Sequence, residues 1–169
     1  MAILVIAGGT ELDESVVERL LSQGDEVRVL EATGVRRERW QQLGAFLAVG
    51  EGDDPDLVER AAQDVRTVVV LSDRVTPETV ATVLEAGPKA GVDRLICCAP
   101  EVASAVRGVV RASRLDHVLL QTGRPGLLRR KTVSGPRIAE AVDAADDLAA
   151  HPRLEIDLTD PEQGKLLGI

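Results

Sequence analysis

The chain has 169 residues, which is enough for one globular domain with a buried core. Its formal net charge of −8 argues against nucleic acid as the main partner, since phosphate contacts need a basic surface. No apolar run approaches the length of a membrane span, and the amino-terminal residues lack the basic region of a signal peptide, so we expect a cytoplasmic protein without membrane contact.

The first stretch of the chain predicts a strand, a tight turn and a helix. An apolar run over residues 3–7 reaches Gly8 and Gly9, and Thr10 then leads into a segment whose apolar residues share one helical face. These apolar residues are Leu12, Val16, Val17, Leu20 and Leu21. This order is typical of the opening unit of a dinucleotide-binding fold.

Strands and helices alternate along the rest of the chain. Apolar runs predict further strands over 26–31, 45–49, 67–71, 94–98, 117–121 and 154–158. Helical patterns are found over 35–43, 55–62, 77–87, 101–113 and 136–150. The alternation predicts an α/β protein with a three-layer, doubly wound parallel sheet. For the Rossmann-type fold that the opening unit indicates, the expected strand order is 3-2-1-4-5-6, with a short extra strand. We expect residues 1–169 to form a single domain that lacks a separate substrate lobe.

Composition limits the chemistry that the chain can perform. Cys97 and Cys98 are neighbours in a strand, so their side chains point to opposite faces and two reduced thiols are expected. No cluster of Cys and His has metal-ligand spacing, and zinc is not expected. The sequence contains no tyrosine, which excludes any mechanism that uses a tyrosine as acid or base.

Five motifs, found in the right order, resemble the atypical short-chain dehydrogenase/reductases, the NmrA-like and epimerase-like NAD(P)-binding proteins. The first, at the glycine turn, is the start of that family's T-G-A-T-G-x-x-G pattern. The motifs are Ala7-Gly8-Gly9-Thr10, Leu20-Leu21-Ser22-Gln23-Gly24-Asp25-Glu26-Val27-Arg28, Gly50-Glu51-Gly52-Asp53-Asp54-Pro55, Gly91-Val92-Asp93-Arg94-Leu95-Ile96 and Thr122-Gly123-Arg124-Pro125-Gly126. The resemblance implies a Rossmann fold in which Gly8, Gly9 and Thr10 hold a dinucleotide.

Three more residues are candidates for binding the same cofactor. Glu31 ends the second strand, where the resemblance implies an acid on the ribose 2′-hydroxyl of NAD, although a strand-end acid can also simply face water. Glu51 stands where the family has an aspartate that contacts adenine. Ser72 follows the fourth strand at the expected crevice, either as a ligand contact or as part of the turn.

The sequence departs from the family pattern at positions that matter for function. Aligned on Gly8, the second and third glycines of the family fall at Glu11 and Glu14, and Ala99 and Pro100 replace a catalytic serine. A carboxylate ~6 Å from a phosphate costs roughly 2–3 kcal/mol at an effective dielectric of ~20. Together with Asp13, these acids can satisfy the helix dipole without any ligand.

These departures favour a degenerate NAD(P)-binding-like protein that acts as a non-redox binding, regulatory or assembly module, with no cofactor and as a homo-oligomer. One alternative is an NAD-dependent oxidoreductase or epimerase-like enzyme of the atypical short-chain dehydrogenase type. A second alternative is a non-redox isomerase or cyclase that uses the emptied crevice.

Charged clusters outside the glycine turn are weaker indicators of a binding site. The loop from Arg124 to Lys131 follows a strand end and is the expected place for a small anionic ligand, although its arginines can equally face solvent. A basic stripe on the helix over 101–113 suits an acidic partner or, more simply, a solvated face; its members are Arg107, Arg111 and Arg114. A solvated face is also predicted for Asp143, Asp146 and Asp147.

Overall fold

A computed structural model of the chain describes residues 1–123, 133–148 and 153–169. Its strands form one parallel sheet of seven strands in the order β3-β2-β1-β4-β5-β6-β7, which confirms the predicted α/β fold and its strand order. The strands are β1 (Ala2–Ala7), β2 (Glu26–Glu31), β3 (Phe46–Val49), β4 (Thr67–Leu71), β5 (Arg94–Ala99), β6 (Asp116–Gln121) and β7 (Arg153–Asp157).

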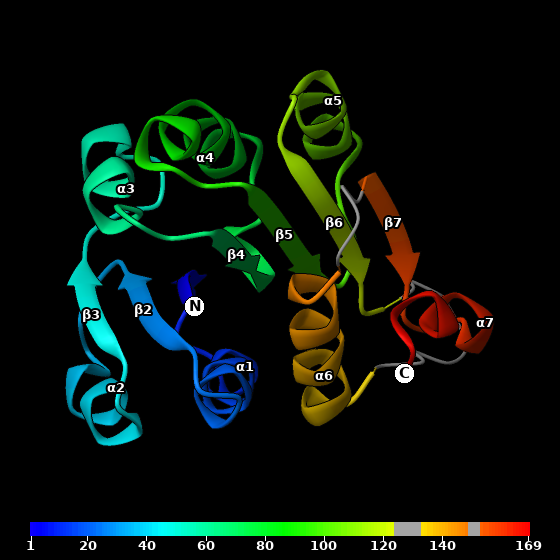
Figure 1. The fold of residues 1–169 in the computed structure, drawn as a ribbon, viewed down its shortest axis with the longest axis horizontal. Coiled ribbons are helices and arrows are strands. Elements are labelled where there is room, and N and C mark those ends of the chain that lie inside the picture. Colours follow the sequence, from blue (N-terminus) through cyan, green and yellow to red (C-terminus); the bar gives the residue numbers. More distant parts are fainter. Residues whose placement is uncertain (124–132, 149–152) are drawn as a thin grey trace.

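Helices cover both faces of the sheet, as Figure 1 shows. On one face lie α1 (Glu11–Ser22), α2 (Arg37–Leu43) and α6 (Gly135–Asp146). On the other face lie α3 (Pro55–Ala61), α4 (Pro77–Ala90) and α5 (Ser104–Ala112). Short turns η1 (Ser72–Arg74), α7 (Pro161–Gly164) and η2 (Lys165–Leu167) complete the described structure. No helix in the described residues combines the length and the hydropathy that crossing a lipid bilayer requires.

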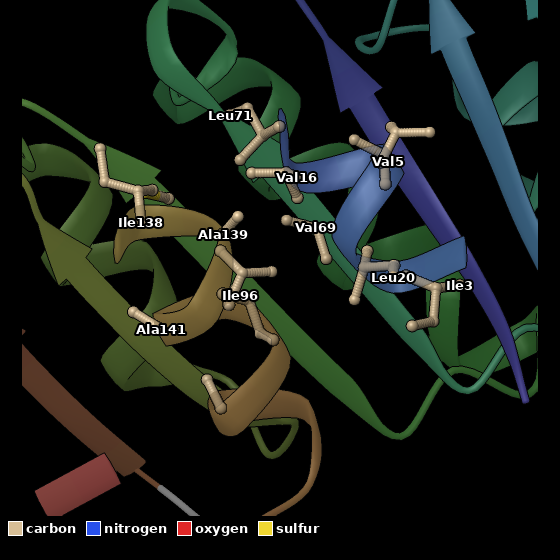
Figure 2. Close-up of a cluster of buried hydrophobic side chains, with 14 of the residues drawn as sticks. Ile3, Val5, Val16, Leu20, Val69, Leu71, Ile96, Ile138, Ala139 and Ala141 are labelled. Atoms are coloured by element: carbon tan, nitrogen blue, oxygen red, sulfur yellow. The ribbon is translucent and has the colours of Figure 1, made fainter. Parts of the chain in front are cut away.

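Two apolar layers form the core because the side chains of a strand alternate between its faces. One layer packs α1 and α6 over β1, β4 and β5 (Figure 2). In that view Val16 and Leu20 of α1 face the strands beside Ala139 of α6. Cys98 belongs to this layer and Cys97 to the opposite one, and both are buried free thiols, as predicted. Burial raises the pKa of the Cys98 thiol to about 12, which makes it a poor nucleophile at neutral pH.

Most element boundaries agree with the sequence pattern, and α4 shows where local signals mislead. The pair Gly87-Pro88 predicts a helix end at Gly87, but α4 continues to Ala90. Pro88 lies exposed in the last turn, where the loss of one helical hydrogen bond is tolerated. The helix ends instead at Gly91, whose φ of 91° is the left-handed conformation typical of a helix C-cap.

Several charged residues of α5 and α6 pair with residues of other elements. Arg107 and Arg111 of α5 both pair with Glu155 of β7, at 2.6 and 3.6 Å. Asp143 of α6 pairs with Arg19 of α1 at 2.8 Å. Asp146 is buried and accepts a hydrogen bond from the hydroxyl of Thr67 on β4. The prediction of a solvated face was therefore wrong for Asp146, which is buried, and Arg107 and Asp143 are only partly exposed. Arg111, Arg114 and Asp147 are exposed as expected.

Candidate functional site

The carboxyl ends of β1 and β4 lie side by side where the strand order reverses, the usual ligand crevice of such sheets. The glycine turn follows β1 and leads directly into α1. Gly9 has a φ of 84°, a left-handed conformation that a residue with a side chain adopts only with strain. A Cβ on Gly8 would lie only 2.3 Å from Asp73 Oδ1, so the absence of a side chain permits this close approach.

Thr10 and Asp13 cap the start of α1. The amide of Thr10 donates to Asp13 Oδ2, and the amide of Asp13 donates to Thr10 Oγ1. Burial raises the pKa of the Asp13 carboxyl, and the amides and hydroxyl of the turn lower it in part. The amides of Glu11 and Leu12 have no hydrogen-bond partner within the part of the chain that the structure describes. The predicted capping by acidic residues therefore holds for Asp13, and two amides stay open at the mouth of α1.

Glu14, which stands at the position of the third family glycine, pairs with two arginines. Its two carboxylate oxygens pair with Arg36 Nη1 at 2.5 Å and with Arg39 Nε at 2.9 Å. Two arginines thus compensate the charge whose repulsion was expected to exclude a diphosphate. Sequence analysis did not single out Arg36 or Arg39, although an acid at a glycine position and arginines around the next helix are visible in the sequence.

Glu31 lies where the resemblance places it, at the end of β2 and beside the glycine turn. Its Oε1 is 3.0 Å from the position that a Cβ on Gly9 would occupy. Its Oε2 accepts a hydrogen bond from Trp40 Nε1 at 3.3 Å, and the residue is only 5% exposed. The alternative of a strand-end acid that faces water is therefore wrong, because the indole of α2 covers this carboxylate.

Ser72 and Glu51 border the same crevice from β4 and β3. Ser72 has a φ of 54°, which is uncommon for a residue with a side chain and found often at functional sites. The next residue, Asp73, lies against Gly8, and Arg74 Nη1 pairs with Glu51 Oε2 at 3.3 Å. The structure therefore groups Gly8, Gly9, Thr10 and Glu31 closely, while Glu51 is exposed and bonded across the crevice to Arg74.

A pocket of about 440 Å³ lies beyond the carboxyl ends of β5 and β6, between the first turns of α1 and α6. Its described lining is mostly apolar and carries one ionisable side chain, that of Glu11. The lining residues are Glu11, Leu12, Ser15, Pro100, Thr122, Gly123, Val133, Gly135, Pro136 and Ile138. Sequence analysis did not predict this pocket, because α1 and α6 are more than a hundred residues apart in sequence. The loop from Arg124 to Lys131, the expected anion site, lies outside the described residues.

Within residues 1–123, 133–148 and 153–169, no group of three or more His, Cys, Asp or Glu side chains is placed to hold a metal ion. The residues of the crevice do fit a dinucleotide. They offer two open amides at the mouth of α1, glycines without side chains at the turn, and a buried carboxylate at the end of β2.

No protein-family model and no curated protein sequence matches this chain. Solved structures do match. ChuY, an anaerobillin reductase from Escherichia coli O157:H7, superposes with a TM-score of 0.76 at 14% identity, over 96% of this chain and 98% of its own. The triphenylmethane reductase of Citrobacter sp., in complex with NADP(H), gives a TM-score of 0.70 at 14% identity, over 94% and 70% of the two chains. An NADPH-dependent quinone oxidoreductase from Escherichia coli gives 0.72 at 14% identity, over 92% and 67%.

These comparisons contradict the leading interpretation of the sequence, a non-redox binding, regulatory or assembly module, and favour its oxidoreductase alternative. The three solved proteins are reductases or an oxidoreductase, and ChuY matches over nearly its whole length. The physical reason for the error is the orientation of Glu14, which pairs with Arg36 and Arg39 instead of facing a phosphate. The chain has the fold of the NmrA-like and epimerase-like NAD(P)-binding reductases that its sequence resembles.

Proposed function

We propose that this chain is an NAD(P)H-dependent reductase that reduces a small organic acceptor in the pocket between α1 and α6. The observation that carries the proposal is the position of this pocket. It adjoins the mouth of α1, where two amides are open, and it lies at the ends of β5 and β6. A dinucleotide whose diphosphate lies on those amides can extend one end toward Glu31 and the other toward the pocket.

The proposed chemistry is a hydride transfer. A bound reduced nicotinamide supplies the hydride, which carries two electrons to the acceptor, and water supplies the proton that completes the reduction. The chain's own residues bind and orient: the amides of Glu11 and Leu12 hold the diphosphate, and the apolar lining packs against the acceptor.

The described pocket lining also favours one kind of acceptor. Glu11 is its only ionisable side chain, and the sequence has no tyrosine. A simple ketone develops an alkoxide that needs a proton donor, whereas a conjugated acceptor such as a quinone spreads the incoming charge over its π-system. The solved structures of similar fold include a quinone oxidoreductase and a triphenylmethane dye reductase, which supports a conjugated acceptor for this chain.

The first experiment is thermal unfolding with NAD, NADH, NADP and NADPH in turn. A ligand at a hundred times its dissociation constant adds ~2.7 kcal/mol of stability, which raises the melting temperature by roughly 5–10 °C in a domain of this size. Dinucleotide oxidation is then followed by absorbance with a quinone and a triphenylmethane dye. No shift with any of the four dinucleotides would refute the proposal.

A matched pair of variants tests the remaining acid at the turn. Glu11→Gln removes a charge beside the open amides and is expected to tighten dinucleotide binding about tenfold, since the repulsion is ~2 kcal/mol at most for an exposed carboxylate. Glu18→Gln makes the same change about 10 Å further along α1 and is expected to leave binding unchanged. Equal effects of the two variants would contradict the placement of the diphosphate.

We also propose an anionic group on the acceptor and a homo-oligomer. The loop from Arg124 to Lys131 connects two residues of the pocket lining, Gly123 and Val133, in the sequence. Its arginines are therefore proposed to bind an anionic group on the acceptor. A homo-oligomer through the outer helices is the second, and light scattering on a gel-filtered sample measures it directly.

A further inference from the structure

We infer that the hydroxyl of Thr122 donates a hydrogen bond to a carbonyl oxygen of the acceptor, so that the pocket selects quinone-like carbonyl compounds among conjugated acceptors. The inference rests on the proposed function, because it names the group that holds the acceptor of the proposed reductase. Thr122 follows β6 and belongs to the pocket lining. Neither the sequence motifs nor the crevice around the glycine turn assigns it a role.

The first step concerns the direction of the Thr122 side chain. Val118 and Leu120 of β6 belong to the apolar layer that packs against α1 and α6. Side chains two residues apart along a strand share a face of the sheet, so the next position on this face is that of Thr122. The residue lines the pocket between α1 and α6 and is only 7% exposed. A buried hydroxyl therefore lies at the base of an otherwise mostly apolar pocket.

The second step concerns the hydrogen bonds of Thr122. Its amide donates to the carbonyl oxygen of Ala99 at 3.0 Å, and its own carbonyl oxygen accepts from the amide of Val133 at 3.2 Å. These two bonds fix its backbone to β5 on one side and to the approach to α6 on the other. Its side-chain hydroxyl has no hydrogen-bond partner in the part of the chain that the structure describes. The hydroxyl proton is therefore available to a ligand from a fixed position.

The third step compares Thr122 with its neighbours in the lining. The other hydroxyl, that of Ser15, already donates to the carbonyl oxygen of Glu11 at 3.0 Å. The Glu11 carboxylate accepts hydrogen bonds and donates none. Beside Thr122, the amide of Gly123 donates to the carbonyl oxygen of Pro100 at 3.1 Å, and Pro100 has no amide hydrogen. Within the described lining, Thr122 is thus the side chain with an unused donor.

The fourth step concerns the start of α6, which forms another wall of the pocket. Gly135 and Pro136 line the pocket and lie in the first turn of this 12-residue helix. Ser134 at the N-cap makes no side-chain hydrogen bond to that turn, and no described residue accepts from the Gly135 amide. An uncapped helix start carries partial positive charge. Negative charge that develops on an acceptor oxygen is therefore stabilised in this pocket.

These features suit the reduction of a quinone. The hydride from a reduced nicotinamide carries two electrons into the conjugated ring, and a carbonyl electron pair moves onto the oxygen. The Thr122 hydroxyl holds this oxygen and keeps its own proton, and a water molecule supplies the proton that completes the hydroquinone, leaving hydroxide. A triphenylmethane dye without a carbonyl group develops no such charged oxygen. The hydroxyl therefore favours the quinone over the dye.

The activity test compares these two acceptors in each variant. Thr122→Val removes the hydroxyl and keeps the shape of the side chain. The ratio of kcat/KM for the quinone to that for the dye is expected to fall about 10- to 100-fold, the range for one hydrogen bond to a charged group. Thr122→Ser is expected to recover most of the ratio. Ser15→Ala is the matched control, because it removes the hydroxyl whose proton is already used, and it is expected to keep the ratio.

A binding measurement tests the same hydroxyl without any redox step. Para-nitrophenolate carries a conjugated oxygen anion like the one that forms during quinone reduction, and nitrobenzene has the same ring without that oxygen. Calorimetry is carried out with both compounds in the absence of a dinucleotide, at a pH at which the phenol is ionised. The preference for the phenolate over nitrobenzene is expected to be at least ~10-fold smaller in Thr122→Val than in the wild-type chain.

Three outcomes are decisive. An unchanged ratio of quinone to dye reduction in Thr122→Val would overturn the inference and leave the proposed function standing. An equal loss of the ratio in Thr122→Val and Ser15→Ala would also overturn it, because the polarity of the pocket and not a free donor would then explain both. If the wild-type chain oxidises no dinucleotide with either acceptor, the proposed function fails. The calorimetry then still decides on Thr122, since an equal phenolate preference in the two proteins would overturn the inference as well.

Discussion

Thr10 and Asp13 cap α1 reciprocally, with the Thr10 amide 2.7 Å from Asp13 Oδ2 and the Asp13 amide 3.3 Å from Thr10 Oγ1. Asp13 is fully buried, and its Oδ1 has no hydrogen-bond partner among the described side chains and backbone. The cap therefore fixes the turn at the centre of the candidate site while it keeps a carboxylate away from water. Burial raises the pKa of this carboxyl, which has consequences for stability.

Asp13 is expected to make the folded chain less stable as the pH rises. The folded state holds the Asp13 proton to a higher pH than the unfolded state, where the pKa is 3.8, so more protons are bound in the folded state above that pH. The free energy of unfolding of the wild-type chain then falls relative to that of Asp13→Asn as the pH rises from about 4 toward neutrality. Urea unfolding of both proteins across this range measures the difference, and a constant difference would contradict the prediction.

Gly9 is expected to be essential for binding as well as for the backbone. Gly9→Ala strains a residue with a φ of 84° and places a Cβ between Glu31 and Arg36. The expected cost is about 1–2 kcal/mol of stability and at least a tenfold loss in dinucleotide affinity, about 1.4 kcal/mol.

Gly24→Ala is the matched control for Gly9→Ala. Gly24 has a nearly identical φ of 89°, but a Cβ there meets no atom within 4 Å, and the residue lies at the far end of α1. The two variants are expected to lose similar stability in urea unfolding, and only Gly9→Ala should lose binding. Loss of affinity in both variants would show that the effect arises from general destabilisation.

The core between α1, α6 and the sheet is expected to account for much of the stability. Ile96 is completely buried in β5, where it packs in the layer drawn in Figure 2. Ile96→Ala should cost about 2–5 kcal/mol, through lost apolar burial and the cavity left behind, and Ile96→Val about 0.5–1.5 kcal/mol. Val35→Ala, at a residue that is 83% exposed, should stay within about 0.5 kcal/mol of wild type. Chemical unfolding measures all three, and a small effect at Ile96 would contradict the packing described.

Glu155 of β7 is expected to contribute modestly to the attachment of α5. Glu155→Gln breaks its pairs with Arg107 and Arg111, and because these side chains are partly exposed the loss should stay below about 1 kcal/mol. At about 1 M salt the difference should largely disappear, since the screening length falls to ~3 Å. A loss that persists at high salt would show that packing, and not charge, holds α5 to β7.

The sequence by itself determined the order and type of the elements. Local patterns predict these elements: the apolar run Val68-Val69-Val70-Leu71 fits a strand buried on both faces, and the spacing of Val16 and Leu20 fits one face of a helix. Gly8 and Gly9 likewise fixed the place of the turn, because the chain reverses there between a strand and a helix. The strand order followed from the resemblance to a Rossmann-type fold, because alternation and right-handed connections alone also allow other doubly wound orders.

The destination of each charged side chain was decided only by the tertiary structure. Glu14 meets Arg36 and Arg39 from another element, Glu31 is covered by Trp40, and Asp146 is buried against Thr67 from the fourth strand. The pocket likewise exists only because α6 packs beside α1. Long polar side chains can reach partners in any neighbouring element, and which elements become neighbours depends on the packing of the whole sheet. The repulsion inferred from the sequence holds for a free carboxylate. It does not apply to Glu14, because the fold pairs this carboxylate with two arginines.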